Sequence, residues 1–279
     1  MILNLDAQFK PKSGEEIAFE SFVFSGGEPH IRIQAFDTTK AVHLTHRIRS
    51  FNDLGLLVIA VDALKRMKVN SIHLILPYFP AARQDRIMTQ GESLTVKVVA
   101  DIINNLSLSS ITIFDPHSDV TPALLDHCTE ISNYAFITAV LKSLPNDFIL
   151  VSPDAGAAKK VHKLARHLGK SEILECSKKR DVKTGALSEF VVPSQQLEGN
   201  PCLIVDDICD AGGTFLGLGE ALKKKGAGEL YLAVSHGIFS KGLDHLTEMF
   251  KMIFTTDSFR TMDNTDNFKQ LKFDNALLS

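Results

Sequence analysis

The sequence predicts an α/β protein with two doubly wound parallel-sheet domains. Along its 279 residues, segments with apolar residues at helical spacing alternate with short runs of β-branched and aromatic residues. Alternating helices and buried strands are typical of a parallel sheet covered on both faces. A composition of 44% hydrophobic and 23% charged residues is enough to bury one large core or two of moderate size.

The first set of helix and strand units begins at Asn52. Apolar residues recur at helical spacing from Asn52 to Arg66, and the run SIHLILPYF, residues 71–79, then predicts a buried strand. A second helix is expected over Leu94–Leu106, and it leads to a strand over residues 111–114.

The second set of units places helices over residues 155–168 and 216–226. The strands expected with them span residues 172–176, 202–205 and 229–234. Two sets of units fit two sheets better than one sheet. The predicted domains are therefore residues 1–134 and 135–279, with the break near Tyr134.

Charge and cysteine content restrict the partners. A formal net charge of −3 gives no broad attraction to nucleic acid or to an acidic membrane, so we expect small-molecule partners, no nucleic acid and no membrane. The apolar run Leu54–Leu64 is too short to span a bilayer, and no basic segment precedes an apolar one at the N-terminus. The cysteines form no C-x-x-C pair, which favours reduced thiols and a cytoplasmic location.

The stretch VDDICDAGGTF, Val205–Phe215, combines acids with a glycine turn ahead of a helix. Its polar and glycine positions are Asp206, Asp207, Asp210, Ala211, Gly212, Gly213 and Thr214. Backbone N–H groups at such a turn bind phosphate, whereas neighbouring carboxylates accept hydrogen bonds from vicinal hydroxyls or hold Mg²⁺. A sugar phosphate offers both partners. The alternative is a strand-to-helix turn whose acids cap the helix.

This stretch resembles the phosphoribosyl pyrophosphate loop of type I phosphoribosyltransferases and of ribose-phosphate pyrophosphokinases, with Ala211 at the usual Thr position. A second stretch, PYFPAARQDR over Pro77–Arg86, resembles an ATP-site segment of the pyrophosphokinases alone. FSGGE, Phe24–Glu28, resembles the loop that reaches adenine from a neighbouring subunit, although Gly26 stands where Asp or Asn is common. FDPHSD, VSPDAG, KKR and VSHGIFS follow in the family's order. The chain is thereby identified as a member of the ribose-phosphate pyrophosphokinase family.

The resemblance implies transfer of the β,γ-pyrophosphoryl group of ATP to the 1-hydroxyl of ribose 5-phosphate, with Mg²⁺ as cofactor, in a homo-oligomer. It also implies two domains of the type I phosphoribosyltransferase kind. The first contributes to the ATP site, and the second carries the ribose 5-phosphate loop and a catalytic flap. The implied ATP-binding residues are Phe24, Glu28, Arg83, Gln84 and Asp85. The implied catalytic residues, which close over the triphosphate, are Lys178 and Arg180. The implied metal ligands are His117 and Asp154.

Each of these residues has a structural alternative. A basic cluster such as that at Lys178 is often a solvated loop, and Asp154 can cap the helix that follows it. A loop histidine such as His117 is often held by structural hydrogen bonds, Phe24 can be a core aromatic, and Arg83 with Gln84 can lie on a helix surface. A phosphoribosyltransferase or a non-catalytic homologue is the alternative for the whole chain.

A departure from the family concerns regulation. Phosphate-activated members of the family carry basic and serine residues after the ATP-site segment, where this chain has Ile87–Gly91 without a cation. The resemblance therefore implies that activity does not require phosphate as an activator.

Overall fold

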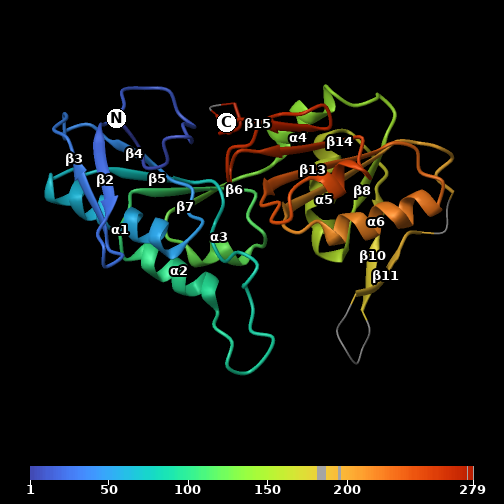
Figure 1. The fold of residues 1–279 in the computed structure, drawn as a ribbon, viewed down its shortest axis with the longest axis horizontal. Helices are drawn as coiled ribbons and strands as arrows, with labels where there is room; N and C mark the ends of the chain where they lie inside the picture. Colours follow the sequence, from blue (N-terminus) through green and yellow to red (C-terminus); the bar gives the residue numbers. More distant parts are fainter. Residues whose placement is uncertain (181–186, 194–195, 275, 279) are drawn as a thin grey trace. The chain divides into compact units, whose positions relative to one another are not determined.

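Two α/β units make up the described part of the chain, and each is built on a parallel sheet (Figure 1). The structure is a computed structural model that describes all residues except 181–186, 194–195, 275 and 279, and the side chains of 179, 180 and 187–189. The first unit is Met1–Ser132 with Lys272–Ser279, and the second is Asn133–Leu271. The division of roles between residues 1–134 and 135–279 stays a prediction.

The first unit has a five-stranded parallel sheet whose strands follow one another in chain order, β1-β4-β5-β6-β7. Its strands are β1 (Ile2–Asn4), β4 (Val42–Thr45), β5 (Ile72–Leu76), β6 (Ser110–Phe114) and β7 (Cys128–Ile131). Its helices are α1 (Phe51–Arg66), α2 (Thr95–Asn104) and α3 (Val120–Leu124). The helices and strands expected between Asn52 and residue 114 are confirmed, with ends shifted by a few residues.

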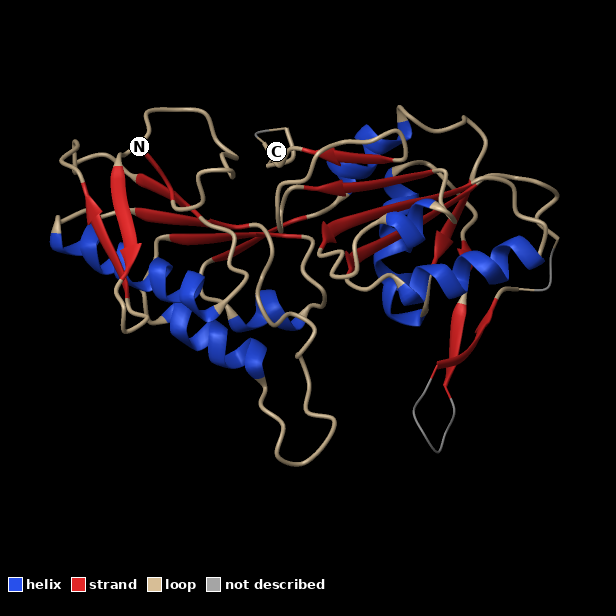
Figure 2. Ribbon diagram, in the orientation of Figure 1, coloured by secondary structure: helices blue, strands red, loops and turns tan. Residues whose placement is uncertain are grey.

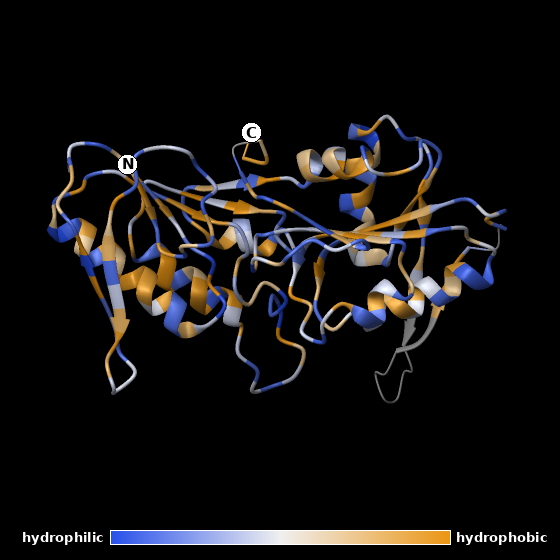
Figure 3. Cartoon of the chain, turned by 45° about the horizontal axis from the view of Figure 1, so that its top comes forward, coloured by the Kyte–Doolittle hydropathy of each residue, from blue (hydrophilic) through white to orange (hydrophobic). Residues whose placement is uncertain are grey.

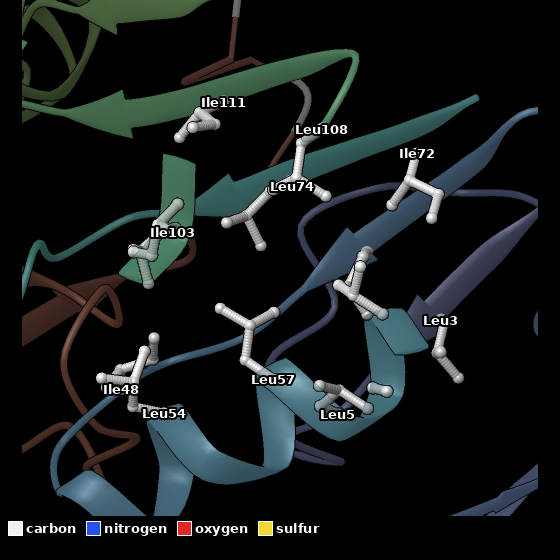
Figure 4. Packing of buried hydrophobic residues seen from close by; sticks show 14 of the residues in the cluster. Leu3, Leu5, Ile48, Leu54, Leu57, Ile72, Leu74, Ile103, Leu108 and Ile111 are labelled. Carbon is white, nitrogen blue, oxygen red and sulfur yellow. The ribbon is translucent and has the colours of Figure 1, made fainter. Parts of the chain in front are cut away.

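Helix α1 begins where a serine caps it and buries one apolar face. The Ser50 hydroxyl accepts a hydrogen bond from the Asp53 N–H at 3.2 Å, which satisfies one of the free donors at the helix start. Leu54 and Leu57 of this helix are buried, and they belong to the same core cluster as Leu74 of β5, part of which Figure 4 shows. Burying such a leucine contributes about 1.5–3 kcal/mol, so this face fixes the helix on the sheet.

An antiparallel hairpin that the sequence did not predict packs against α1. It consists of β2 (Phe19–Val23) and β3 (Pro29–Ile33). Four of the five β2 residues, from Glu20 on, are exposed, so the strand shows little apolar alternation. Its turn contains Gly27 at φ 94°, a conformation that glycine adopts without strain.

The second unit has a six-stranded parallel sheet in the order β15-β14-β13-β12-β8-β9. The strands are β8 (Ile149–Ser152), β9 (Leu174–Glu175), β12 (Cys202–Cys209), β13 (Leu230–Gly237), β14 (Met252–Thr256) and β15 (Phe268–Leu271). The helices are α4 (Tyr134–Leu141), α5 (Ala155–His167), α6 (Gly213–Lys224) and α7 (Asp244–Thr247). A separate antiparallel pair, β10 (Ser177–Arg180) and β11 (Leu187–Val191), stands away from this sheet in Figure 2.

The strand order of the second sheet reverses between β8 and β12, because the chain passes from β8 to β9 on one side and then returns to β12 on the other. In open α/β sheets, ligands bind beyond the carboxyl ends of the strands at such a reversal. Asp154 follows β8, and the acidic stretch covers the carboxyl end of β12 and the turn after it, so the topology places both sequence candidates at the expected ligand position.

Hydropathy follows this architecture. Most strand segments of both sheets are hydrophobic in Figure 3, and all eight residues of β13 are buried. Among the described residues, no helix is long and apolar enough to cross a membrane.

The last segment of the chain belongs to the first unit. Phe273 is 2% exposed, and its ring lies 4.9 Å from that of Phe114 and 6.0 Å from that of Phe9, measured between centroids. Large buried aromatic side chains dominate the packing of a core. The chain therefore returns to the first unit after β15.

Candidate active site

Two adjacent acids lie inside strand β12. The sequence placed Asp206 and Asp207 in a loop after a strand over residues 202–205, and this was wrong because β12 continues to Cys209. Pairing with β13 along this length satisfies the backbone groups of the strand, which overrides the low strand propensity of aspartate.

The acid pair is electrostatically strained. The Asp207 N–H donates to Asp206 Oδ1 at 2.9 Å, and Asp207 itself is buried. Burial raises the pKa of Asp206 well above its usual value, and the Asp207 carboxyl and the charge of Asp154 raise it further. Acids held together in this way are typical of a site that binds a cation, or that accepts hydrogen bonds from the hydroxyl groups of a ligand.

The turn after β12 presents the N-terminus of helix α6. Gly212 is the N-cap at φ 80°, and as a glycine it has no side chain to cap the helix. The cap position of α6 is therefore not occupied by one of the acids. The helix's own bonds begin with Phe215 and Leu216, whose N–H groups both donate to the Gly212 carbonyl at 3.0 Å.

The N–H groups of Gly213 and Thr214 precede those bonds. They lie at the positive end of the helix dipole, which suits a phosphate. Asp210 and Ala211 complete the turn between the acid pair and this helix end. Carboxylates and an anion-binding helix end thus follow one another on a single strand-turn-helix unit.

Lys178 and Asp154 are brought together. Lys178 Nζ donates to Asp154 Oδ2 at 2.6 Å, and the other oxygen, Oδ1, accepts the Ala157 N–H at 3.1 Å as the N-cap of α5. Burial raises the pKa of Asp154, but the hydrogen bond and the charge of Lys178, together with the N–H groups of Ala157 and Gly156, outweigh it, and the net pKa is lowered. Asp154 is a helix cap, as the alternative had it, and it also holds the predicted catalytic lysine.

The basic cluster lies on a strand and not in an irregular loop. Lys178 is part of β10, which pairs with β11. Arg180 is the last residue of β10, and the structure describes its backbone but not its side chain. The polar stretch DVKTG, residues 181–185, which the sequence suits to a flap, also lies outside the described part of the chain.

Phe190 connects the base of this hairpin to α6. It pairs with Lys178 across the strands, and Lys178 Nζ lies 5.9 Å from the centroid of its ring. The ring lies directly over Gly217 of α6, since a Cβ atom added there would be 2.7 Å from Phe190 Cε2. Helix α6 therefore supports both the anion-binding turn and the strand that carries Lys178.

The predicted ATP residues of the first unit follow β5. Arg83 and Gln84 are exposed in a turn, where the Gln84 N–H donates to the Ala81 carbonyl at 2.8 Å, and not on a helix surface. Asp85 is 9% exposed and accepts a hydrogen bond from Arg86 Nε at 3.0 Å. Burial raises the pKa of Asp85, but hydrogen bonds from Arg86 and Ser118 outweigh it and lower the pKa.

His117 lies in the loop after β6, next to Ser118. The charge of His117 also lowers the pKa of Asp85, by less than the hydrogen bonds from Arg86 and Ser118 do. The structure therefore brings the loops after β5 and β6 together, with Asp85 between them. This arrangement joins two sequence segments that the resemblance assigned to one nucleotide site.

Phe24 and Glu28 lie at the tip of the β2–β3 hairpin. Phe24 is 52% exposed, so it is not a core aromatic. Its ring forms an edge contact with that of Phe22 at 4.8 Å, and its N–H donates to the Glu28 carbonyl at 2.9 Å. An exposed aromatic ring at a hairpin tip can stack on a planar partner.

The described residues contain no group of three or more His, Cys, Asp or Glu side chains arranged to hold a metal ion. His117 is in the first unit and Asp154 in the second. A hard cation such as Mg²⁺ usually takes one or two protein carboxylates and completes its shell with phosphate and water oxygens. Asp154 and the strained acid pair fit that kind of site, whereas the imidazole of His117 is a poorer ligand for it.

Sequence reasoning missed His245. Its ring nitrogen Nε2 lies 3.1 Å from the Ala211 carbonyl oxygen, although 34 positions separate the two residues. It belongs to the four-residue helix α7, which has no periodic apolar pattern to mark it. Only the packing of α7 against the turn reveals the contact.

Comparison with known proteins matches both units. Residues 18–106 match the model described as the N-terminal domain of ribose phosphate pyrophosphokinase, and residues 121–261 match that of the phosphoribosyl transferase domain. The ribose-phosphate pyrophosphokinase of Prochlorococcus marinus is 30% identical over 94% of this chain and 83% of its own length. That of Mycoplasma pneumoniae is 31% identical over 90% and 76%. The crystal structure of phosphoribosylpyrophosphate synthetase from Mycobacterium smegmatis has the same fold, with a TM-score of 0.83, 23% identity, and coverage of 100% and 95%.

Proposed function

Because this chain belongs to the ribose-phosphate pyrophosphokinase family, we propose that it transfers the β,γ-pyrophosphoryl group of ATP to the 1-hydroxyl of ribose 5-phosphate. The products would be phosphoribosyl pyrophosphate and AMP. Both substrates are small and anionic, in keeping with a chain of net charge −3 that binds anions through local groups. A cytoplasmic location stays a prediction.

The acid pair next to the α6 N-terminus is the observation that carries this proposal. The N–H groups of Gly213 and Thr214 would bind the 5′-phosphate, and Asp206 and Asp207 would accept hydrogen bonds from the ribose hydroxyls. Donated hydroxyl hydrogens relieve the repulsion that raises the pKa of Asp206. A sugar phosphate therefore satisfies both halves of the site.

Lys178 supplies positive charge for the transfer. Two polyanions have to meet, and unit charges about 4 Å apart interact by roughly 4 kcal/mol at an effective dielectric near 20. Lys178 Nζ, bound to Asp154 at 2.6 Å, would exchange that carboxylate for a phosphate oxygen of ATP. Arg180, two residues along the same strand, is proposed to do the same. Positioned charge of this kind supplies most of the catalysis in phosphoryl transfer.

The first unit is proposed to bind ATP. Arg83 and Gln84, both exposed, offer a guanidinium fork and an amide to phosphate or base. Phe24 and Glu28 would contact adenine, and as parts of an exposed hairpin tip they are suited to reach a neighbouring copy of the chain. A homo-oligomer is therefore proposed. Light scattering on an active sample tests it, and a monomeric mass would contradict it.

Mg²⁺ is the proposed cofactor. Asp154 is the residue of the second unit that would hold it, and His117 is the proposed ligand in the first unit, with the remaining ligands drawn from substrate phosphates and water. When bound, it supplies charge that offsets the repulsion between phosphates. The Lys178 contact leaves Asp154 ionised, which is the form that binds a cation.

Release of AMP from ATP tests the proposed reaction. It should depend on both ribose 5-phosphate and Mg²⁺, and AMP should form in proportion to phosphoribosyl pyrophosphate. Pyrophosphate release that depends on an added nucleobase, without AMP formation, would instead indicate a phosphoribosyltransferase.

Calorimetric titration of Asp207→Ala tests the division of the site. Affinity for ribose 5-phosphate should fall while affinity for ATP is largely kept, because the acid pair faces the sugar. Asp263→Ala, at an exposed position of the same unit, is the control and should leave both affinities unchanged. Equal loss of both affinities in Asp207→Ala would contradict the assignment.

A further inference from the structure

The peptide between Ala211 and Gly212 is held from the side of its carbonyl. His245 Nε2 lies 3.1 Å from the Ala211 oxygen. A carbonyl oxygen can only accept, so Nε2 carries the hydrogen and the imidazole donates it. His245 thus contacts the turn through a directed hydrogen bond.

The same peptide is held from the side of its N–H group. Burial raises the pKa of Cys209 to about 12, and a hydrogen bond from the Gly212 N–H opposes this rise at the thiol sulfur. In a trans peptide the C=O and N–H groups point in opposite directions. His245 and Cys209 therefore fix the plane of this peptide from its two sides.

Packing on Gly212 leaves no room for a side chain at this position. A Cβ atom added there would lie 2.9 Å from Leu246 Cδ2 and 3.0 Å from His245 Nε2. Leu246 is fully buried, so it cannot move aside easily. Helix α7 therefore lies directly against the turn that starts α6.

This geometry determines which donors remain for a phosphate. The N–H of Gly212 is directed at Cys209, and its carbonyl accepts from Phe215 and Leu216. The donors ahead of α6 are then the N–H groups of Gly213 and Thr214, whose directions follow from the plane of the preceding peptide. A turn without this support would have to be ordered when the ligand binds, at a cost in affinity.

We propose that His245 is a positioning residue for ribose 5-phosphate, which holds the Ala211–Gly212 peptide so that the next N–H groups face the 5′-phosphate. The inference rests on the proposed function of this turn. The imidazole does not touch the ligand, and its contribution is the orientation of the backbone that does.

Calorimetric titration of ribose 5-phosphate into the full chain tests this role. In His245→Ala, the Kd should rise roughly two- to tenfold, the range expected for the loss of one hydrogen bond that orders the site. His245→Gln should restore an affinity near that of wild type, since the glutamine Nε2 lies as many bonds from Cβ as the imidazole Nε2. The Kd for ATP should stay unchanged in both variants.

His162→Ala is the matched control. His162 lies in α5 of the same unit, with its Nε2 2.8 Å from Glu175 on the surface, and its removal should not change the Kd for ribose 5-phosphate. Thermal melts of all variants separate loss of fold from loss of binding. A His245→Ala variant that folds and binds with wild-type affinity overturns the inference, and so does a glutamine variant as weak as the alanine variant.

Failure of the proposed function gives a different result. Wild-type protein that binds no ribose 5-phosphate contradicts that function, and the role of His245 is then lost with it. Wild-type binding together with an unchanged Kd in His245→Ala contradicts the positioning role alone.

Discussion

Replacing Gly217 by alanine should misplace the lysine proposed for catalysis. The added Cβ would lie 2.7 Å from Phe190 Cε2 and 3.0 Å from Cδ2. Ordinary carbon contacts are about 3.5–4.0 Å, so the ring has to move by roughly 1 Å. Phe190 pairs with Lys178 across the hairpin, and the shift is transmitted to that strand. A displacement of about 1 Å can lower kcat by up to about 100-fold.

The effect on stability should be smaller than the effect on rate. Overpacking costs about 1–3 kcal/mol, and replacing a helical glycine by alanine recovers about 1 kcal/mol. We therefore expect Gly217→Ala to lose about 0–2 kcal/mol of unfolding free energy. Steady-state assays of AMP release give kcat and KM, and thermal melts give the change in stability.

Gly219→Ala is the control for this substitution. It lies in the same helix, and its added Cβ would lie 2.8 Å from Met249 Cγ, a comparable steric conflict away from the hairpin. Methionine adapts its shape readily, so kcat should stay within about twofold of wild type. Equal kcat values for the two variants, or wild-type kcat in Gly217→Ala, would refute the reasoning that Phe190 positions Lys178.

Three further changes have expected outcomes. Burial and the neighbouring carboxyl raise the pKa of Asp206, so its charged form destabilises the folded chain at pH 7. Asp206→Asn should therefore stabilise the free protein by about 0.5–2 kcal/mol at pH 7 and abolish activity. The gain in stability should shrink as the pH falls toward 3.8, where the aspartate of the unfolded chain also takes up its proton. Equal melting temperatures of the variant and the wild type at pH 7 would contradict this. Lys178→Ala should lower kcat by about 100- to 1,000-fold with little change in KM, and a near wild-type kcat in steady-state assays would remove its catalytic role. Activity should not require phosphate, because Glu92 Oε2 already accepts the N–H groups of Met88 at 2.8 Å and Thr89 at 3.1 Å; strong activation on phosphate titration would contradict this.

Many of the helices and strands could be predicted from the local spacing of apolar residues. Helix α1 was predicted within one residue at its start, because its apolar residues recur at helical spacing. The strand after it was predicted from β-branched residues, although β5 ends at Leu76, ahead of the proline that cannot donate to a ladder. The buried face of such an element can be recognised from the residues of that element alone.

The remaining elements depend on partners far away in sequence. Asp206 and Asp207 read as loop residues, yet β13 pairs with β12 along most of its length and keeps the acids in a strand. The hairpin that carries Lys178 is short and polar, and it is supported by Phe190 on Gly217 rather than by apolar alternation. His245 reaches its carbonyl through tertiary packing alone. Motif resemblance therefore named the candidate site residues, whereas the contacts that support them come from tertiary packing.

The return of the chain to the first unit makes the second unit an insertion. Asn133–Leu271 is a continuous segment, whereas the first unit needs two pieces of chain, one of which ends at Ser279. Expression of residues 1–132 alone would leave Phe9 and Phe114 without the ring of Phe273 and open a cavity in the core. The segment to express on its own is therefore residues 133–271. A C-terminal truncation should destabilise the first unit, although most of that unit comes from the N-terminal part of the chain.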